Sequence, residues 1–508
     1  MSATDLNNTA GPRIVRADSM PADTPQVPVV MVGAGACGLT AAVRLRDAGI
    51  DCVLLERDAM ATGSTALSSG FIPAAGTRLQ KSLGIEDSAE KFAEDIQAKA
   101  HGDAAPHLVT AYAQAVVQAI DSLEQHGIGF EVLDGFLYPG HSVRRMHALP
   151  ERTGAALMMQ LERAASSAGA DVLTEAVVRE LWLNTDERVL GVGYQRPDGS
   201  MEYLACELLI LSCNGFGGNS QMVSELLPAM AQALFVGHVG NDGSAIAWGK
   251  ALGARLADLG GYQGHGSWVT PQGALMSWAP MMEGAVQVNS HGLRFHNENQ
   301  GYSEAAVHVL DQPGGVAFNV FDAPLLTLAR TFPDFVEAEA AGALKTAADI
   351  PSLAALIGCD ADTLANTLSA VAPGAPDAFG RSFKRALSAP YYAVKVTGTL
   401  FHTQGGLDID ADCRVLRADG SPLPNLLAAG GAARGVSGNA VWGYLSGNGL
   451  LSAVGGGWVA AGTAASNWRQ LEPLPADFLN TFLRSGQYGH HTPTTSAAAP
   501  GLAGSRDL

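Results

Sequence analysis

The chain has 508 residues, and 47% of them are hydrophobic, which is enough to build more than one packed core. It carries 31 Lys and Arg against 49 Asp and Glu, giving a formal net charge of −18. A surface with this charge repels nucleic acids and anionic membranes, so neither is expected as a partner.

The cysteines and the two chain ends exclude further classes of protein. The six cysteines show no CxxC spacing and no cluster with histidine, so zinc, c-type haem and iron–sulfur sites lack ligands. We expect free thiols in a reducing cytoplasm. Residues 1–27 lack the apolar core of a signal peptide and predict a flexible tail. Residues 450–465, rich in Gly and Ala, fall short of the ~20 apolar residues of a membrane span and predict a buried helix instead.

A nucleotide-binding pattern follows the tail. Residues 28–58, PVVMVGAGACGLTAAVRLRDAGIDCVLLERD, read as an apolar strand, a glycine turn, a helix and a second strand that ends in an acid. Gly33 allows the tight turn, Gly35 lets a pyrophosphate approach the backbone, and Gly38 lets the helix lie close to the strand. Glu56 is placed to accept hydrogen bonds from a ribose. The pattern predicts a bound dinucleotide.

The next segment favours FAD over NAD. Residues 62–77, TGSTALSSGFIPAAGT, form a loop of small residues whose N–H groups and hydroxyls suit a ring system lying against backbone. An NAD-binding fold usually continues with regular strand–helix units. Periodicity then predicts helices over 106–126 and 154–168, and strands over 170–178, 191–195 and 207–212.

Later motifs identify the family that the chain resembles. ELLILSCNGFGGN at 207–219 is similar to a strand and turn that usually ends ATGGFGGN, and GHVGNDGSAIAWGKALGA at 237–254 is similar to a GDGI segment. Residues 405–435 are similar to GGLxID followed by PIPGLYAAGE. Together with the nucleotide end, these motifs resemble the fumarate reductase and succinate dehydrogenase flavoprotein superfamily over residues 28–465.

The resemblance implies an α/β fold with a discontinuous, Rossmann-like (GR2-type) FAD-binding domain, 28–262 plus 403–470. An inserted α+β capping domain, 263–402, would meet it at the active site, and 471–508 would be a C-terminal extension with a disordered end. Members that attach FAD covalently use a histidine in the loop at 62–77, where this chain has none, so FAD should be non-covalent. We expect FAD contacts from Gly33, Ala34, Gly35, Ala36, Gly38, Glu56, Arg57, Ser64, Thr65, Ser69, Gly70, Val178, Asn214, Gly215, Asp242, Gly406, Gly430, Ser446 and Leu450. Asp242 would hold the ribityl chain at the start of a helix, a role compatible with an ordinary N-cap.

Fumarate reductases hold a dicarboxylate with arginines and two histidines, and an arginine delivers the proton. YQGHGS matches QxHPT and places His265, LFHTQGG matches HHTMGG and places His402, and QVNSHGLRFHNENQGY matches VNxxGxRFxNE. The last motif keeps Arg294 and Glu298.

Three arginine positions of the family are lost. They are held by Gly301, an apolar residue near Leu326, and Tyr444 in GYLSGNG. Guanidinium groups are the natural receptors for carboxylates, so two carboxylates have no receptor here. A phenol can instead donate one hydrogen bond to a neutral oxygen, which suggests a carbonyl substrate.

A branch of the superfamily, the 3-ketosteroid dehydrogenases and cyclic-ketone desaturases, has this replacement. The resemblance implies that Tyr444 and the N–H of Asn448 bind the ketone oxygen. Tyr302, four residues after Glu298, would remove the α-proton while a hydride leaves to the flavin N5. Because an ordinary tyrosine has a pKa of about 10, a base role requires activation by a cation or a hydrogen bond, and His265, His402 and Arg294 are the candidates.

Other functions and plainer roles stay open at this stage. A fumarate-reductase-like enoate or enone reductase, or a carboxylic acid dehydrogenase, is the alternative, with Arg144 or Arg145 replacing one clamp. A non-catalytic flavin protein is a third class, against which the retained histidines argue. The tyrosines could be packing residues, the histidines could orient loops, and Arg294 with Glu298 could be a structural pair.

Two further expectations concern the substrate pocket and the electrons. Electrons should leave to a separate quinone, carrier protein or other oxidant, because the sequence carries no haem or FMN motif. Residues that could line an apolar pocket or belong to the core are Phe71, Trp268, Trp278, Met281, Phe401 and Trp442.

Overall fold

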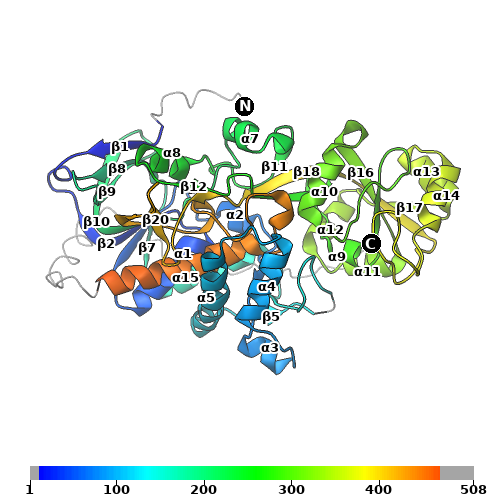
Figure 1. Cartoon of the computed structure of the whole chain (residues 1–508), viewed down its shortest axis with the longest axis horizontal. Coiled ribbons are helices and arrows are strands. Elements are labelled where there is room, and N and C mark those ends of the chain that lie inside the picture. Colours follow the sequence, from blue (N-terminus) through cyan, green and yellow to red (C-terminus); the bar gives the residue numbers. More distant parts are fainter. Residues whose placement is uncertain (1–10, 135, 469–508) are drawn as a thin grey trace, which may run out of the picture. The chain divides into compact units, whose positions relative to one another are not determined.

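The computed structural model describes residues 11–134 and 136–468 (Figure 1). Its largest sheet has nine strands. Their order is β1 (Arg13–Arg16), β8 (Val177–Leu183), β9 (Val189–Gln195), β10 (Met201–Leu211), β2 (Gln26–Val32), β3 (Cys52–Leu55) and β7 (Asp171–Leu173), while β21 (Pro422–Ala428) pairs with both β10 and β20 (Arg414–Leu416). The strands from β21 through β10, β2 and β3 to β7 run parallel, as expected for a nucleotide-binding sheet.

A second sheet is mainly antiparallel. Its strands are β14 (Ala274–Leu275), β13 (Tyr262–Val269), β18 (Tyr391–Thr403), β16 (Val316–Asp322) and β15 (Val286–Val288), and β11 (Leu234–Phe235) and β17 (Lys345–Ala347) also pair with β18. Two small sheets join β12 (Leu256–Ala257) to β19 (Gly406–Leu407), and β6 (Met146–Ala148) to both β4 (Ile72–Pro73) and β5 (Glu131–Val132).

The helices connect and cover these sheets (Figure 1). The α-helices are α1 (Ala36–Asp47), α2 (Gly63–Ala66), α3 (Arg78–Ser82), α4 (Ala89–Lys99), α5 (Pro106–Gln125), α6 (Gly154–Ser167), α7 (Ser220–Leu226), α8 (Ser244–Ala251), α9 (Ala279–Met282), α10 (Tyr302–Leu310), α11 (Ala323–Ala329), α12 (Pro333–Ala340), α13 (Ile350–Ile357), α14 (Ala361–Ser369) and α15 (Asn448–Trp468). Short 3₁₀ turns are η1 (Pro228–Met230), η2 (Pro313–Gly315), η3 (Gly430–Ala432) and η4 (Val441–Gly443).

Helix α15 shows why the glycine-rich segment near the end of the described chain is buried. A side chain at Gly457 would overlap the carbonyl oxygen of Cys37 on α1, and one at Gly456 would lie 3.1 Å from the hydroxyl of Tyr112 on α5. Glycine normally weakens a helix, so close contact with both neighbouring helices compensates for the lost side chains. The predicted buried helix is therefore confirmed.

Two separate hydrophobic clusters follow the two large sheets. The first contains apolar residues of β2, β3 and β10 together with α1, α5 and α15. The second is built from β13, β16 and β18 with α10 and α11, and it includes Tyr302 and Tyr444. Because the described residues form one unit, the domain boundaries themselves stay a prediction.

The local predictions are confirmed for the helices over 106–126 and 154–168, which are α5 and α6. The strand predicted over 170–178 is interrupted between β7 and β8, because Glu175 adopts a left-handed turn with a φ of 55°. The predicted flexible tail does not hold for residues 13–16, since β1 extends the large sheet along β8 with Ile14 opposite Leu181. Residues 1–10 and the predicted C-terminal extension lie outside the described residues.

All six cysteines lie among the described residues and are free thiols. Within residues 11–134 and 136–468, no group of His, Cys, Asp and Glu is arranged to hold a metal ion. No described helix combines the length and the hydropathy needed to cross a bilayer.

Candidate active site

One cavity, with a volume of about 250 Å³, is lined by residues from both large sheets and from the loop at 62–77. The glycine turn after β2, Glu56 and Ser64 belong to its lining. So do Tyr302 and Tyr444 from the second hydrophobic cluster. The cavity therefore joins the predicted cofactor motifs to the predicted substrate motifs.

The glycine turn fits a dinucleotide because only glycine can occupy it. Gly33 has a φ of +101°, and a side chain there would come within 2.7 Å of the carbonyl oxygen of Ser212. A side chain at Gly38 would overlap the carbonyl oxygen of Gly33. Helix α1 begins at Ala36 after the glycine N-cap Gly35, with no acid in its first turn, and the N–H of Ala36 donates to Oγ1 of Thr65 at 3.3 Å. A helix N-terminus without an acid attracts a pyrophosphate, so the turn fits FAD.

Glu56 is anchored at the end of β3 with its carboxylate in the cavity lining. Oε2 accepts a hydrogen bond from the N–H of Ala34 at 3.0 Å, and Oε1 accepts one from the N–H of Asp58 at 3.1 Å. A carboxylate has about four acceptor sites, so two remain for ribose hydroxyls. The geometry agrees with the predicted ribose contact.

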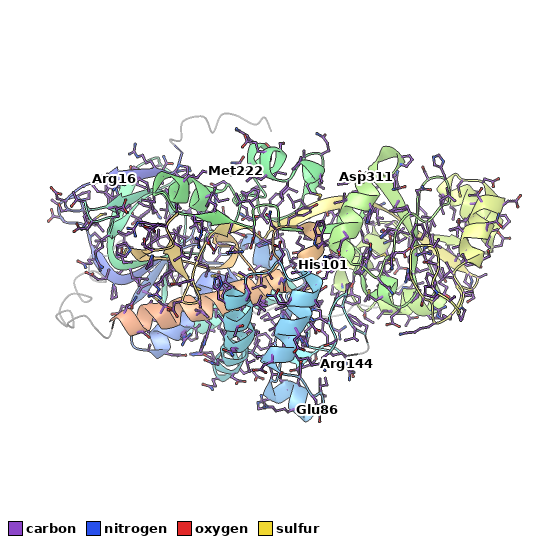
Figure 2. All side chains as sticks on the ribbon, viewed as in Figure 1. Arg16, Glu86, His101, Arg144, Met222 and Asp311 are labelled. Atoms are coloured by element: carbon purple, nitrogen blue, oxygen red, sulfur yellow. The ribbon has the colours of Figure 1, made fainter. Side chains whose placement is uncertain are left out.

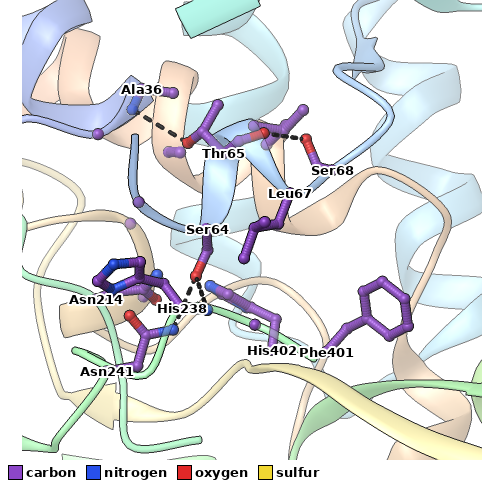
Figure 3. A pocket seen from close by; sticks show the side chains of 18 of the residues that line it. Ala36, Ser64, Thr65, Leu67, Ser68, Asn214, His238, Asn241, Phe401 and His402 are labelled. Atoms are coloured by element: carbon purple, nitrogen blue, oxygen red, sulfur yellow. Dashed lines mark hydrogen bonds between the residues drawn. The ribbon is translucent and has the colours of Figure 1, made fainter. Parts of the chain in front are cut away.

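Ser64 is oriented as a hydrogen-bond donor. Its Oγ accepts from the N–H of His238 at 3.2 Å and from Nδ2 of Asn241 at 2.8 Å (Figure 3). A hydroxyl accepts two hydrogen bonds and donates one, so the Ser64 proton is left to donate to a ligand in the cavity. Ser68 differs, because its hydroxyl already donates to the carbonyl oxygen of Thr65 at 2.7 Å.

Arg57 and Asp242 form a charged pair in the lining. Arg57 donates to the carbonyl oxygen of Gly240 at 2.7 Å and to Oδ2 of Asp242 at 3.2 Å, while Oδ1 of Asp242 accepts from the Ser244 hydroxyl at 2.6 Å. Asp242 precedes α8, as expected. Within the part of the chain that the structure describes, Arg57 is the one arginine that lines the cavity.

Most of the predicted FAD contacts come together at the cavity. Its lining includes Gly33, Gly35, Ala36, Glu56, Arg57, Ser64, Thr65, Ser69, Gly70, Val178, Asn214, Asp242, Gly430, Ser446 and Leu450. It does not include Ala34, Gly38, Gly215 or Gly406. The three glycines among them let other segments approach closely, since side chains at Gly38, Gly215 and Gly406 would collide with Gly33, Thr403 and Ala432. The N–H of Ala34 donates to Glu56.

Four of the predicted catalytic side chains also line the cavity: Tyr302, Tyr444, His265 and His402. The ring centroids of Tyr302 and Tyr444 lie 6.0 Å apart. His265 stacks on Tyr302 with a centroid distance of 4.7 Å. Tyr302 is the first residue of α10, so the helix start presents its ring to the cavity.

All four groups are electrically neutral near pH 7. Burial raises the pKa of Tyr302 well above 10, and the neighbouring Tyr444 raises it further. Burial also raises the pKa of Tyr444 to about 12, although the N–H groups of Gly449 and Gly447 oppose it. Burial lowers the pKa of His265 to about 3 and that of His402 to about 4. Neither histidine is therefore a cation that could activate Tyr302.

Arg294, the remaining predicted catalytic cation, lies outside the cavity lining. Its Nε and one terminal nitrogen bind the two carboxylate oxygens of Glu298 at 3.0 and 2.6 Å, and its other terminal nitrogen pairs with Asp377. Arg381 also binds Glu298, at 2.7 Å. The arginines hold the pKa of Glu298 down to about 2 against the effect of burial. This geometry supports the structural-pair interpretation.

The Glu298 cluster nevertheless supports the site. The backbone carbonyl of Glu298 accepts a hydrogen bond from Nε1 of Trp278 at 2.9 Å, and Trp278 lines the cavity. The ring of Trp278 meets His265 edge-on at 5.8 Å. A buried ion cluster therefore holds the aromatic wall against which Tyr302 stands.

Asn448 is placed differently from the prediction. It does not line the cavity, and its N–H already donates to the carbonyl oxygen of Leu445 at 3.0 Å. The following residue, Gly449, lines the cavity, and its N–H faces the Tyr444 oxygen. The structure thus brings Gly449, and not Asn448, beside Tyr444.

No replacement clamp for a carboxylate reaches the described cavity. Arg145 is fully buried and binds Asp87 at 2.9 Å through Nε. Arg144, which Figure 2 labels, pairs with Asp134. Neither arginine lines the cavity. At the lost arginine positions, Leu326 is 5% exposed within the second hydrophobic cluster, and Gly301 adjoins Glu304.

The apolar lining is only partly as predicted. Phe71, Trp278 and Phe401 line the cavity, whereas Trp268 and Met281 do not, and Trp442 is 48% exposed and stacks on His101. Sequence reasoning missed Tyr138, which lines the cavity and adds to the rise in the pKa of Tyr302 that burial and Tyr444 cause. It lies in an irregular loop between β5 and β6, where no periodicity or motif marks it.

The chain is similar to known proteins in sequence and in fold. A family profile described as an FAD binding domain matches residues 28–450. A probable fumarate reductase of Shewanella frigidimarina is 29% identical over 455 residues, which cover 88% of this chain and 76% of that protein. A 4-oxocyclohexanecarboxylate 2-dehydrogenase of Sinomonas cyclohexanicum is 24% identical over 513 residues, covering 80% of this chain and 87% of that protein. The solved 3-ketosteroid Δ4-(5α)-dehydrogenase of Rhodococcus jostii has the same fold, with a TM-score of 0.72 at 23% identity and coverage of 89% and 99%.

Replacing Ser64 by alanine should weaken FAD binding. The variant removes a hydroxyl whose proton is free to donate to a ligand, so we expect the dissociation constant of FAD to rise about threefold to tenfold. Titration of the apoprotein with FAD, followed by flavin fluorescence, measures this. Ser82→Ala, an exposed position on α3, is the control, and equal affinities in the two variants would contradict the donor role.

Replacing Glu298 by glutamine should destabilise the protein. Two buried arginines would lose their carboxylate, which typically costs about 3–5 kcal/mol, and thermal denaturation should show a lower midpoint. Because the pKa of Glu298 is lowered to about 2, the stabilisation is present above its unfolded pKa and is lost as the pH falls toward 2. Acid should therefore reduce the difference in unfolding midpoint between wild type and Glu298→Gln. A difference in midpoint that grows in acid would refute the buried ion pairing of Glu298.

Proposed function

The chain belongs to the FAD binding domain family, and from that membership we propose that it desaturates a cyclic ketone next to its carbonyl group. In this proposal it is an FAD-dependent oxidoreductase of the CH–CH group whose site belongs with the ketosteroid and cyclic-ketone branch. A 3-ketosteroid or a cyclohexanone-type compound is the substrate class. Relatives named as fumarate reductases and as a dehydrogenase of an oxocyclohexane acid support the reaction class.

A single observation carries the choice of a ketone. The substrate side of the cavity presents two neutral tyrosines, Tyr302 and Tyr444, where a carboxylate would need arginine. Burying a carboxylate beside neutral groups alone would be costly, whereas a carbonyl oxygen needs only hydrogen-bond donors. The Tyr444 hydroxyl is such a donor.

The protein residues divide the work in the following way. Tyr444 donates to the ketone oxygen and stabilises the negative charge that develops there, with Gly449 N–H beside it, an effect typically worth about 3–4 kcal/mol for one donor. Tyr302 takes the α-proton. The chemistry that FAD supplies when bound is acceptance of the β-hydrogen with two electrons. The aromatic rings of Trp278 and Phe401 exclude water from the reacting atoms.

FAD would be held without a covalent bond by residues already in the lining. The N-terminus of α1 would receive the pyrophosphate, Glu56 the ribose and Ser64 an acceptor atom. His238 also lines the cavity, but both of its ring nitrogens are used, by Asp58 at 2.8 Å and by the N–H of Gly240 at 3.0 Å. Electrons then pass to a separate acceptor, and the cytoplasm is the proposed location.

A second candidate is the reverse reaction, reduction of an enone. The raised pKa of Tyr302 favours it, because a neutral phenol is ready to give a proton and must lose one before it can act as a base. Both directions use the same residues. The acceptor and its potential decide between them.

Anaerobic bleaching of the bound flavin tests the substrate class. Cyclohexanone-type ketones and 3-ketosteroids should bleach it, while succinate and other saturated acids should not. Tyr302→Phe should slow bleaching by about 10²–10⁴-fold, and Tyr444→Phe by about 10²–10³-fold. Tyr203→Phe on β10, outside the cavity, is the control. Bleaching by acids alone would sink the ketone proposal.

The rate of ketone-driven bleaching should rise with pH. Because the pKa of Tyr302 lies well above 10, its ionised fraction grows about tenfold per pH unit between about pH 7 and pH 9. Enone reduction, which uses the neutral phenol, should stay level over the same range. Stopped-flow traces in both directions measure this, and a bleaching rate independent of pH would remove Tyr302 as the base.

A further inference from the structure

We propose that Gln404 is a positioning residue that fixes the tautomer of His402, so that His402 Nε2–H donates a hydrogen bond into the cavity. The group bound there must then be a hydrogen-bond acceptor. Identifying this acceptor as a ketone oxygen rests on the proposed function, but the tautomer assignment does not. The inference comes from a chain of hydrogen bonds that runs from α15 to His402.

The chain begins at the buried amide of Asn448. Its Nδ2 lies 2.9 Å from Oγ of Ser437 and 3.5 Å from the carbonyl oxygen of Val436. A backbone carbonyl only accepts, so the atom facing both groups is the nitrogen. Asn448 therefore donates to the Ser437 hydroxyl.

The next two steps follow the Ser437 hydroxyl. It accepts a hydrogen bond from Asn448 and donates its own proton to Oε1 of Gln404, at 3.1 Å. The oxygen of the Gln404 amide is thereby turned toward Ser437, and the NH₂ group is turned toward His402. Gln404 is 2% exposed, so water does not compete with these partners.

The last step assigns the histidine. Nε2 of Gln404 lies 2.8 Å from Nδ1 of His402. An amide nitrogen donates and does not accept, so Nδ1 must hold a lone pair and the ring proton must be on Nε2. A side chain added at Gly431 would come within 2.9 Å of Nε2, and Gly431 lines the cavity. The protonated nitrogen therefore lies at the cavity wall.

The region around Gly449 faces the unprotonated side of the ring. A side chain at this position would lie 3.6 Å from the Tyr444 hydroxyl, 3.8 Å from Nε2 of Gln404 and 3.9 Å from Nδ1 of His402. Because the Gln404 amide occupies Nδ1, His402 donates nothing toward Gly449, and its proton is directed to the side of the cavity lined by Gly431.

Gln404 also departs from the motif that LFHTQGG resembles, HHTMGG, in which methionine stands at this position. A thioether has no proton to donate and leaves the histidine tautomer free. Glutamine at position 404 therefore adds a constraint that the motif itself does not contain.

The test uses the FAD-loaded protein with isotope-labelled histidine nitrogens, and NMR identifies His402 by its loss in His402→Gln. We expect Nε2 to be protonated and Nδ1 unprotonated in wild type from about pH 6 to about pH 8. In Gln404→Glu, the new carboxylate can only accept, so Nδ1 should become protonated and the titration of His402 should move up by at least about one pH unit. Gln404→Met should give a mixture of tautomers. Gln232→Glu, at an exposed loop position, is the matched control and should behave as wild type.

Protonation of Nδ1 in wild type, or an unchanged tautomer in Gln404→Glu, would overturn the inference whatever the enzyme does. A second readout is the binding of 2-cyclohexenone, followed by perturbation of the flavin spectrum. In Gln404→Glu its affinity should fall about threefold to tenfold as the pH rises through the new titration of His402, because the neutral ring then loses its Nε2 proton. Wild type should show no such change. If the tautomer shifts as expected but no ketone binds either protein, the proposed function fails while the positioning role stands.

Discussion

Glu298 is a fully buried carboxylate, and the substrate side of the cavity depends on it. Arg294 and Arg381 bind its two oxygens, and its backbone carbonyl holds Trp278. A charge without solvent is tolerated only when it is paired and hydrogen-bonded, so this cluster has one arrangement and resists deformation. The segment that follows Glu298 leads directly into Tyr302, the first residue of α10. Arg294 and Glu298, which the motif comparison connects with the substrate, therefore support the site by holding its structure.

The two ends of the cavity follow different physical rules. At the predicted cofactor end, backbone groups determine what can bind. Glycines leave room for a ligand to approach the backbone, and the start of α1 supplies N–H groups. At the substrate end, buried neutral side chains decide: phenols and imidazoles with pKa values moved away from 7. An environment without charge disfavours a carboxylate and leaves hydrogen-bond direction as the main source of specificity. This is why the orientation of Gln404 matters beyond packing.

Part of the site could not be predicted from its motifs. The motif comparison located Tyr302, Tyr444, His265 and His402, since each occupies a fixed place relative to other motif residues, and all four line the cavity. It named Asn448 as a donor, but that N–H donates to Leu445 in the turn that leads into α15, and Gly449 lies beside Tyr444 instead. Tyr138 carried no signal, because a residue in an irregular loop is placed only by the surfaces that surround it.

The sequence by itself determined the glycine turn, the parallel sheet, helices α5, α6 and α15, and membership of the FAD binding domain family. These follow from local conformational limits and from periodic burial, which neighbouring residues encode directly. Tertiary structure alone decided that Arg294 is paired with Glu298 and Asp377 and that His265 and His402 are neutral. It also decided which nitrogen of His402 carries the proton. Ion pairing, desolvation and hydrogen-bond direction depend on partners distant in the sequence, such as Arg381 for Glu298 and Ser437 for Gln404. No local pattern records those partners, because the fold brings them together.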